Sequence, residues 1–73
     1  MTKDEFLKQL AINGIPATSI SFDDSIKDGY GIRHMYFRWE IFFRERGIEF
    51  NTRGYPSESD ALQALLKDIL EHR

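Results

Sequence analysis

Apolar side chains recur at helical spacing near the start of the chain. From Phe6 they follow at positions i, i+1, i+4 and i+5, which predicts an amphipathic helix over residues 2–12. Thr2 and Glu5 have the spacing of a capping box, in which each side chain accepts a hydrogen bond from the backbone N–H of the other residue. An Asn-Gly pair ending at Gly14 supplies a left-handed C-cap, so we expect the helix to end there.

Three later segments alternate between apolar and polar positions, which is the period of a β-strand. They are residues 17–22, 35–43 and 48–53, separated by an acidic, turn-rich stretch at 23–29 and a tight Glu-Arg-Gly hairpin at 45–47. The middle segment has the longest alternation, which predicts the central strand of an antiparallel sheet with its odd positions facing the core. These positions are Met35, Phe37, Trp39, Ile41 and Phe43.

A second helix is predicted over residues 57–72. Ser57 and Asp60 form its N-terminal cap, and apolar residues follow at i, i+3 and i+4 spacing. The predicted fold is α+β in the order α-β-β-β-α, with a three-stranded antiparallel sheet and two helices packed on one face, and residues 1–73 form a single domain. The predicted core consists of Phe6, Leu10, Ile20, Phe22, Phe37, Trp39, Ile41, Phe43, Phe50, Leu62, Leu65, Leu66 and Ile69.

Composition places the protein among small cytosolic domains. Of its 73 residues, 41% are apolar and 30% are charged, which is typical of a globular protein. Cysteine is absent, whereas a secreted domain of this size usually depends on disulfides. No apolar run approaches the ~20 residues needed to span a bilayer, and the charged N-terminus lacks the apolar segment of a signal peptide. We therefore expect a cytoplasmic location.

Residue types that support catalysis or metal binding are sparse. There is no Cys, and the two histidines, His34 and His72, are far apart in the sequence. No ligand spacing matches a zinc site, the acidic stretch at 23–29 lacks the terminal Glu of a calcium loop, and no Gly-rich phosphate loop is present. We expect a protein that is not an enzyme, needs no cofactor or metal, and functions by binding.

The sheet face opposite the helices is the predicted binding surface. If the odd positions of 35–43 face the helices, the even positions face outward, and the third strand adds Glu49, Asn51 and Arg53 beside them. Exposed Tyr, Phe and Arg side chains are enriched at interface hot spots. The predicted partner-binding residues are Tyr36, Arg38, Glu40, Phe42, Arg44 and Arg53. In a competing interpretation the loop at 23–31 covers the two rings, and the charges only keep the face solvated.

Charge is distributed unevenly along the chain. Residues 33–53 hold five Arg and three Glu, a local charge of +2, and the rest holds five basic and nine acidic residues, a charge of −4, so the formal net charge is −2. Acidic helices are complementary to a basic protein such as a nuclease. The α-β-β-β-α order also occurs in double-stranded RNA-binding domains, but the Ser-Glu-Ser-Asp start of the second helix would repel phosphate. A second nucleic-acid alternative is single-stranded bases stacking on Tyr36 and Phe42.

One stretch has a family resemblance. Residues 39–47 read Trp-Glu-Ile-Phe-Phe-Arg-Glu-Arg-Gly, followed by Phe50 and by Ser-Glu-Ser-Asp-Ala at 57–61. Over roughly residues 39–66 this pattern resembles small bacterial immunity proteins found beside polymorphic and contact-dependent toxins, which carry a Trp-x-x-aromatic-aromatic-x-Glu-Arg-Gly hairpin. The resemblance implies an intracellular protein that binds one cognate toxin and blocks it.

Taken with the residue patterns, this resemblance leads us to expect a monomer or weak dimer that inhibits a protein partner. The expected partner is a toxin or nuclease, and neither nucleic acid nor a membrane is expected to be one. Two alternatives stay open, namely a nucleic-acid-binding module that uses the open sheet face and a phage-encoded inhibitor of a host nuclease.

Overall fold

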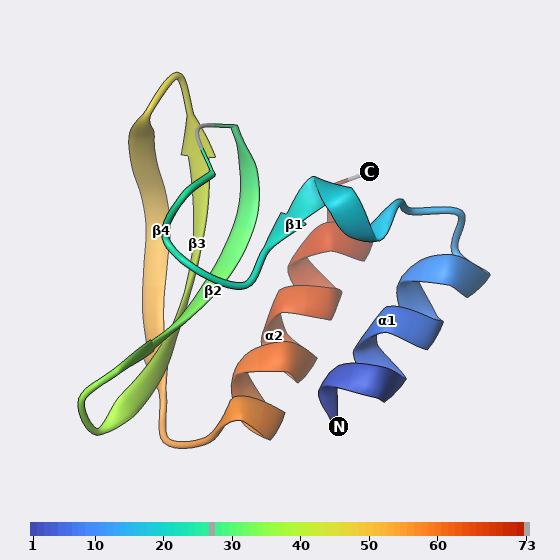
Figure 1. Cartoon of the computed structure of the whole chain (residues 1–73), viewed down its shortest axis with the longest axis horizontal. Helices are drawn as coiled ribbons and strands as arrows, with labels where there is room; N and C mark the ends of the chain where they lie inside the picture. The colour runs from blue at the N-terminus through green and yellow to red at the C-terminus, as the bar shows by residue number, and fades with distance from the viewer. Residues whose placement is uncertain (27, 73) are drawn as a thin grey trace.

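The computed structural model describes residues 1–26 and 28–72 (Figure 1). The elements in chain order are α1 (Lys3–Ile12), the 3-10 helix η1 (Ala17–Ser19), β1 (Ile20–Ser21), β2 (Gly29–Met35), β3 (Arg38–Glu45), β4 (Ile48–Tyr55) and α2 (Glu58–Glu71). The strands form one mixed sheet in the order β1-β2-β3-β4, in which β1 runs parallel to β2 and the other pairs are antiparallel. The α+β class is confirmed, but the expected three-stranded antiparallel sheet is wrong, because β2 is an additional strand. The predicted turn at 23–29 falls mostly in the loop between β1 and β2, and Lys27 lies outside the described residues.

Local sequence signals place the helix starts and one hairpin correctly. The backbone N–H of Glu5 donates to Thr2 Oγ1 at 3.2 Å and that of Thr2 donates to Glu5 Oε1 at 3.3 Å, which completes the capping box. Ser57 caps α2 by accepting a hydrogen bond from the N–H of Asp60 at 3.1 Å. The hairpin at 45–47 is present, and its two turn residues have φ of 53° and 78°, the positive values of a type I′ turn.

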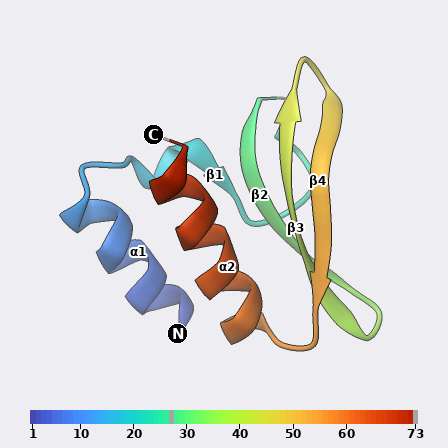
Figure 2. The ribbon, with the colours of Figure 1, turned by 180° about the vertical axis from the view of Figure 1, so that it is seen from behind.

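The helices form two layers on one side of the sheet. Figures 1 and 2 show α2 between α1 and the strands: α2 packs on β2, β3 and β4, whereas α1 packs on α2 and η1. Of the two helices predicted to cover the sheet, α2 is therefore the one that does so. Within the described ranges, no helix is both long enough and apolar enough to cross a lipid bilayer. The core cluster consists of Phe6, Leu10, Ile20, Ile32, Ile41, Ala61, Leu62, Leu65, Leu66 and Ile69.

Tyr36 and Phe37 form a two-residue turn between β2 and β3, where the alternation predicted one continuous strand. Met35 pairs with Arg38 across this turn. Phe37 is 98% exposed, so its predicted place in the core is wrong. Neither turn residue has the positive φ of the favoured two-residue hairpin turns, and neither is Gly, Asn or Asp. The turn therefore carries no local sequence signal.

The turn also reverses which positions face the helices. Ile32 pairs with Ile41, so even residues of β2 share a face with odd residues of β3. An alternation continued back from 35–43 would place His34 on the outward face, but His34 pairs with Trp39 on the helix side of the sheet and stacks on its ring, with centroids 4.3 Å apart. The alternation is therefore correct within β3 and inverted within β2.

A β-bulge changes the face of the last strand. Phe43 pairs with Phe50 and Ile41 with Arg53, so two residues of β4 lie opposite one residue of β3. Asn51, in the bulge, has a positive φ of 54°. Phe50 was predicted to be in the core but is 44% exposed, because β4 is an edge strand. After the bulge, the alternation of β4 is shifted by one residue.

Candidate functional site

Four predicted partner-binding residues, Arg38, Glu40, Phe42 and Arg44, project from β3 on the outer face, which is the sheet side opposite α2. Glu40 is only 5% exposed. Its Oε1 accepts a hydrogen bond from Arg33 Nε at 3.0 Å, and its Oε2 accepts one from Arg38 Nη2 at 2.6 Å. Antiparallel pairing of β2 with β3 places Arg33 directly opposite Glu40. Both oxygens of the Glu40 carboxylate therefore already accept hydrogen bonds within the protein.

Arg44 ties the loop between β1 and β2 to the same face. Its Nη1 donates to the carbonyl oxygens of Asp24 at 2.8 Å and Ile26 at 3.1 Å. Arg44 Nη2 also donates to Glu49 Oε1 at 3.2 Å, and Arg33 Nη1 donates to that same oxygen at 2.8 Å and to Asp24 Oδ1 at 3.0 Å. Three arginines and three carboxylates therefore alternate across the outer face.

Phe42 lies beneath this network and is 2% exposed. The guanidinium carbons of Arg33 and Arg44 lie 4.7 and 4.8 Å from the centroid of its ring. The ring edge packs on Gly31, where there is no room for a Cβ. Phe42 is therefore covered, as the competing interpretation expected, but by the guanidinium groups of Arg33 and Arg44 and by Gly31 of β2. That interpretation does not hold for Tyr36, which is 91% exposed.

The network keeps its acids charged. Hydrogen bonds from Arg33 and Thr52 lower the pKa of Glu49 to about 2, with Arg33 as the largest cause. The Arg33 hydrogen bond also lowers the pKa of Glu40, against the opposing effect of burial. These carboxylates act as hydrogen-bonding partners of the arginines. The outer face consequently presents paired charges to any partner.

Arg53 does not belong to the outer face. The bulge at Asn51 turns Arg53 toward the helix side, where it pairs with Ile41 in the sheet and forms an ion pair with Asp68 of α2. The prediction that Arg53 lies on the outer face beside the residues of β3 is therefore wrong. Strict alternation along β4 assigns Arg53 to that face, but the bulge shifts the alternation by one residue.

The largest exposed apolar side chains that lie together are at the turn between β2 and β3. We call Met35, Tyr36 and Phe37 the aromatic tip; their exposed fractions are 37%, 91% and 98%. Figure 1 shows this turn at the end of a hairpin that projects away from both helices. The exposed side chain of Arg38 flanks the tip, and Glu40 orients it through an ion pair between Arg38 Nη2 and Glu40 Oε2 at 2.6 Å.

Sequence reasoning identified Tyr36 but missed the other two members of the tip. A usable signal was present: the apolar side chains of Tyr30 and Ile32 are at even positions, whereas Trp39, Ile41 and Phe43 are at odd positions. A change of parity between two strand-like runs requires a turn or a bulge between them.

Comparison of the chain with protein-family models, curated proteins and solved structures finds no match. Across the described residues, no group of three or more His, Cys, Asp or Glu side chains is arranged to hold a metal ion.

Proposed function

We propose that this chain is a protein-binding inhibitor, an immunity protein that neutralises a cognate bacterial toxin by occluding it, and that it has no catalytic activity of its own. It acts in the cytoplasm, consistent with its lack of cysteine. The observation that carries this proposal is the aromatic tip. The resemblance to immunity proteins supplies the class of partner.

The tip has the properties of an interface anchor. Burial of a Phe-sized side chain contributes roughly 1.5–3 kcal/mol, and Tyr36 and Phe37 leave nearly all of their surface available for a partner. The antiparallel pairing of β2 with β3 extends up to Met35 and Arg38, so the hairpin is ordered before binding. A partner with an apolar pocket gains this burial at a low entropic cost.

The rest of the outer face fits the rim of such an interface. Its arginines and carboxylates are already paired with one another, so they add polar complementarity around the tip and little net attraction. Base stacking on this face would need an exposed Phe42 ring, and Phe42 is buried. We therefore favour a protein partner over single-stranded nucleic acid.

The proposal is tested by affinity capture from a lysate of the source organism followed by a toxicity assay. Wild-type protein, the Tyr36→Ser/Phe37→Ser double variant and the control Ile12→Ser serve as baits. Ile12 is 73% exposed on α1, so the control removes an exposed apolar side chain away from the tip. The captured protein is then expressed in a bacterial host with and without each bait.

We expect the captured partner to arrest growth when it is expressed alone, and wild type and Ile12→Ser to neutralise it. The double variant should bind the partner at least about 100-fold more weakly, because two hot spots are lost. Neutralisation by the double variant at wild-type potency would contradict the role of the tip. A captured nuclease that is native to the host and not a toxin would favour the phage-inhibitor alternative, and retention of RNA alone would overturn the proposal.

A further inference from the structure

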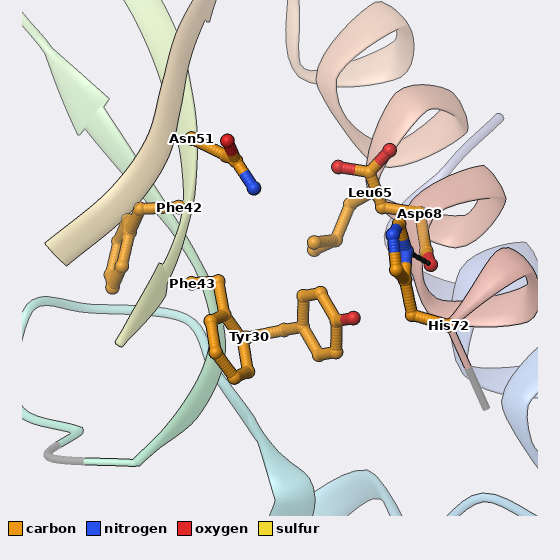
Figure 3. Close-up of a pocket in the computed structure, with 7 residues that line it drawn as sticks. All are labelled: Tyr30, Phe42, Phe43, Asn51, Leu65, Asp68 and His72. Atoms are coloured by element: carbon orange, nitrogen blue, oxygen red, sulfur yellow. Dashed lines mark hydrogen bonds between the residues drawn. The ribbon is translucent and has the colours of Figure 1, made fainter. Parts of the chain in front are cut away.

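A cavity of about 360 Å³ lies between the sheet and the C-terminal half of α2 (Figure 3). Tyr30, Phe43 and Asn51 line it from the strands, and Leu65, Asp68 and His72 line it from the helix side. Its volume falls within the range of small-ligand sites. Tyr30 pairs with Phe43 five residues along β2 from Met35, so the cavity lies about 17 Å from the aromatic tip.

The walls of the cavity are aromatic. The rings of Tyr30 and Phe43 have centroids 5.0 Å apart and planes inclined by 54°, which forms a corner of two ring faces. Leu65 closes the opposite side (Figure 3). The negative faces of aromatic rings attract cations, and a planar cation stacks on them most closely.

The polar groups on the helix side are hydrogen-bond acceptors. Asp68 uses Oδ2 to bind Arg53, and no group of the described residues binds its Oδ1. Nδ1 of His72 lies 2.8 Å from the carbonyl oxygen of Asp68. Because a carbonyl oxygen only accepts, Nδ1 is the donor in this contact, and Nε2 is the ring nitrogen left without a partner among the described residues.

The strand side adds two polar groups that have no protein partner among the described residues. Figure 3 shows the amide nitrogen of Asn51 directed toward Asp68 and the Tyr30 hydroxyl directed toward His72, across the cavity. Asn51 reaches this position because the bulge holds it at a φ of 54°. Both groups can therefore bond a ligand without breaking a hydrogen bond within the protein.

The electrostatics of this end of α2 favour a cation. None of the residues in the last turn of α2 is basic, so the negative end of the helix dipole is uncompensated there by the helix itself. Burial and the negative charge of Asp68 both raise the pKa of Tyr30. An anionic ligand would meet the Asp68 carboxylate, whereas a cation can bind its Oδ1, because the ion pair with Arg53 uses Oδ2.

We propose that this cavity binds a guanidinium group, the arginine side chain of the protein partner. A guanidinium stacks on Tyr30 while its in-plane N–H groups donate to Asp68 Oδ1 and His72 Nε2. An ammonium group is not planar and matches the ring faces less well. The assignment of this guanidinium to a protein partner rests on the proposed function. The binding of a free guanidinium compound to the cavity is independent of it.

The test is a titration of the full chain with ethylguanidinium chloride at neutral pH. NMR chemical shifts of the backbone amides of the cavity residues report binding. Ethylurea, which is nearly the same shape but uncharged, and propionate, which is anionic, are the matched probes. We expect saturable shifts confined to the cavity, with a millimolar Kd for ethylguanidinium and binding at least about tenfold weaker for the other two probes.

Variants locate the site. Asp68→Asn should weaken ethylguanidinium binding about tenfold and Tyr30→Phe about two- to tenfold, whereas Asp60→Asn, a change to an exposed acid in the first turn of α2, should have no effect. If Asp68→Asn does not fold, Tyr30→Phe still tests the site. Shifts that do not saturate, equal affinity for ethylurea, or insensitivity to these substitutions would overturn the proposal.

Two further arms separate this inference from the proposed function. The Tyr36→Ser/Phe37→Ser variant should bind ethylguanidinium like wild type, because the tip is remote from the cavity. Ethylguanidinium should compete with the captured partner for wild type, as expected if an arginine of the partner occupies the cavity. Binding of the probe without competition would instead assign the site to a free guanidinium compound and overturn the role of the partner's arginine.

Discussion

The ring of Phe42 lies against the backbone of Gly31, the residue paired with it on β2, so closely that a Cβ on Gly31 would lie 2.9 Å from Cε1 and closer still to Cζ. This contact leaves room on the outer face for a large ring, whose centroid lies within 4.8 Å of two guanidinium carbons. It also makes Gly31 a packing requirement of the fold.

Gly31→Ala should therefore lower the free energy of unfolding by about 1–3 kcal/mol, through overpacking against the ring. Gly54→Ala is the matched control, because a Cβ there would meet mainly the flexible side chain of Arg38, which can move. Urea unfolding of both variants measures the difference. In a Phe42→Ala background the effect of Gly31→Ala should largely disappear, and equal effects in both backgrounds would contradict the contact.

The two arginines that bind Glu40 should differ in their importance for stability. Arg33→Ala removes a half-buried partner of Glu40 and Glu49 and should destabilise the protein by about 1.5–3 kcal/mol, because a buried carboxylate loses charge-assisted hydrogen bonds. Arg38→Ala removes an exposed partner and should cost about 0–1 kcal/mol. Chemical denaturation under identical conditions measures the free energy of unfolding of both variants. Equal losses of stability in Arg33→Ala and Arg38→Ala would contradict this difference.

Stability should fall at acidic pH in a window determined by Glu49. Its pKa in the folded protein is about 2, below the ordinary value of 4.5, so its contribution is fully present above the ordinary pKa and is lost as the pH falls toward 2. Urea midpoints measured from pH ~6 to ~2 should decline, and Glu49→Gln should flatten this decline.

The flattening should be partial, because Asp23 titrates in the same window. Hydrogen bonds from the side chain and backbone of Ser25, and then from Ser21, lower the pKa of Asp23 to about 2. Asp23→Asn should therefore remove a further part of the slope that Glu49→Gln leaves. An acid slope that is identical in wild type and Glu49→Gln would show that the Arg33 hydrogen bonds do not stabilise the ionised carboxylate.

The position of the turn between β2 and β3 is tested by two substitutions. Phe37→Ser should change the free energy of unfolding by less than about 0.5 kcal/mol, because the side chain contacts mostly solvent. Ile41→Ala should destabilise by about 2–5 kcal/mol, since Ile41 is fully buried against α2 and β2. Comparable losses in thermal unfolding would place Phe37 in the core, as a continuous strand requires.

Features that depend on neighbours in the chain could be read from the sequence. The Thr2–Glu5 capping box, the Ser57 cap and the turn at 45–47 each involve residues two or three positions apart, and their hydrogen bonds and φ angles follow from local chemistry. The apolar spacing of α2 also predicted its buried side, because helical periodicity persists without any information on distant residues.

Features that depend on pairing with distant segments could not be read in this way. The turn at Tyr36 contains no turn-forming residue, so only strand pairing places it there, and it carries Phe37 from the predicted core to solvent. The bulge at Asn51 moves Arg53 to the helix side. Phe42 is buried on a face predicted to be open, because Gly31 leaves room for its ring and two guanidinium groups cover it. Sequence by itself determined the helices, their caps and the alternation within β3, because these depend on spacing along the chain. Tertiary structure alone decided which aromatic rings are exposed, because exposure depends on which strand a residue meets across the sheet.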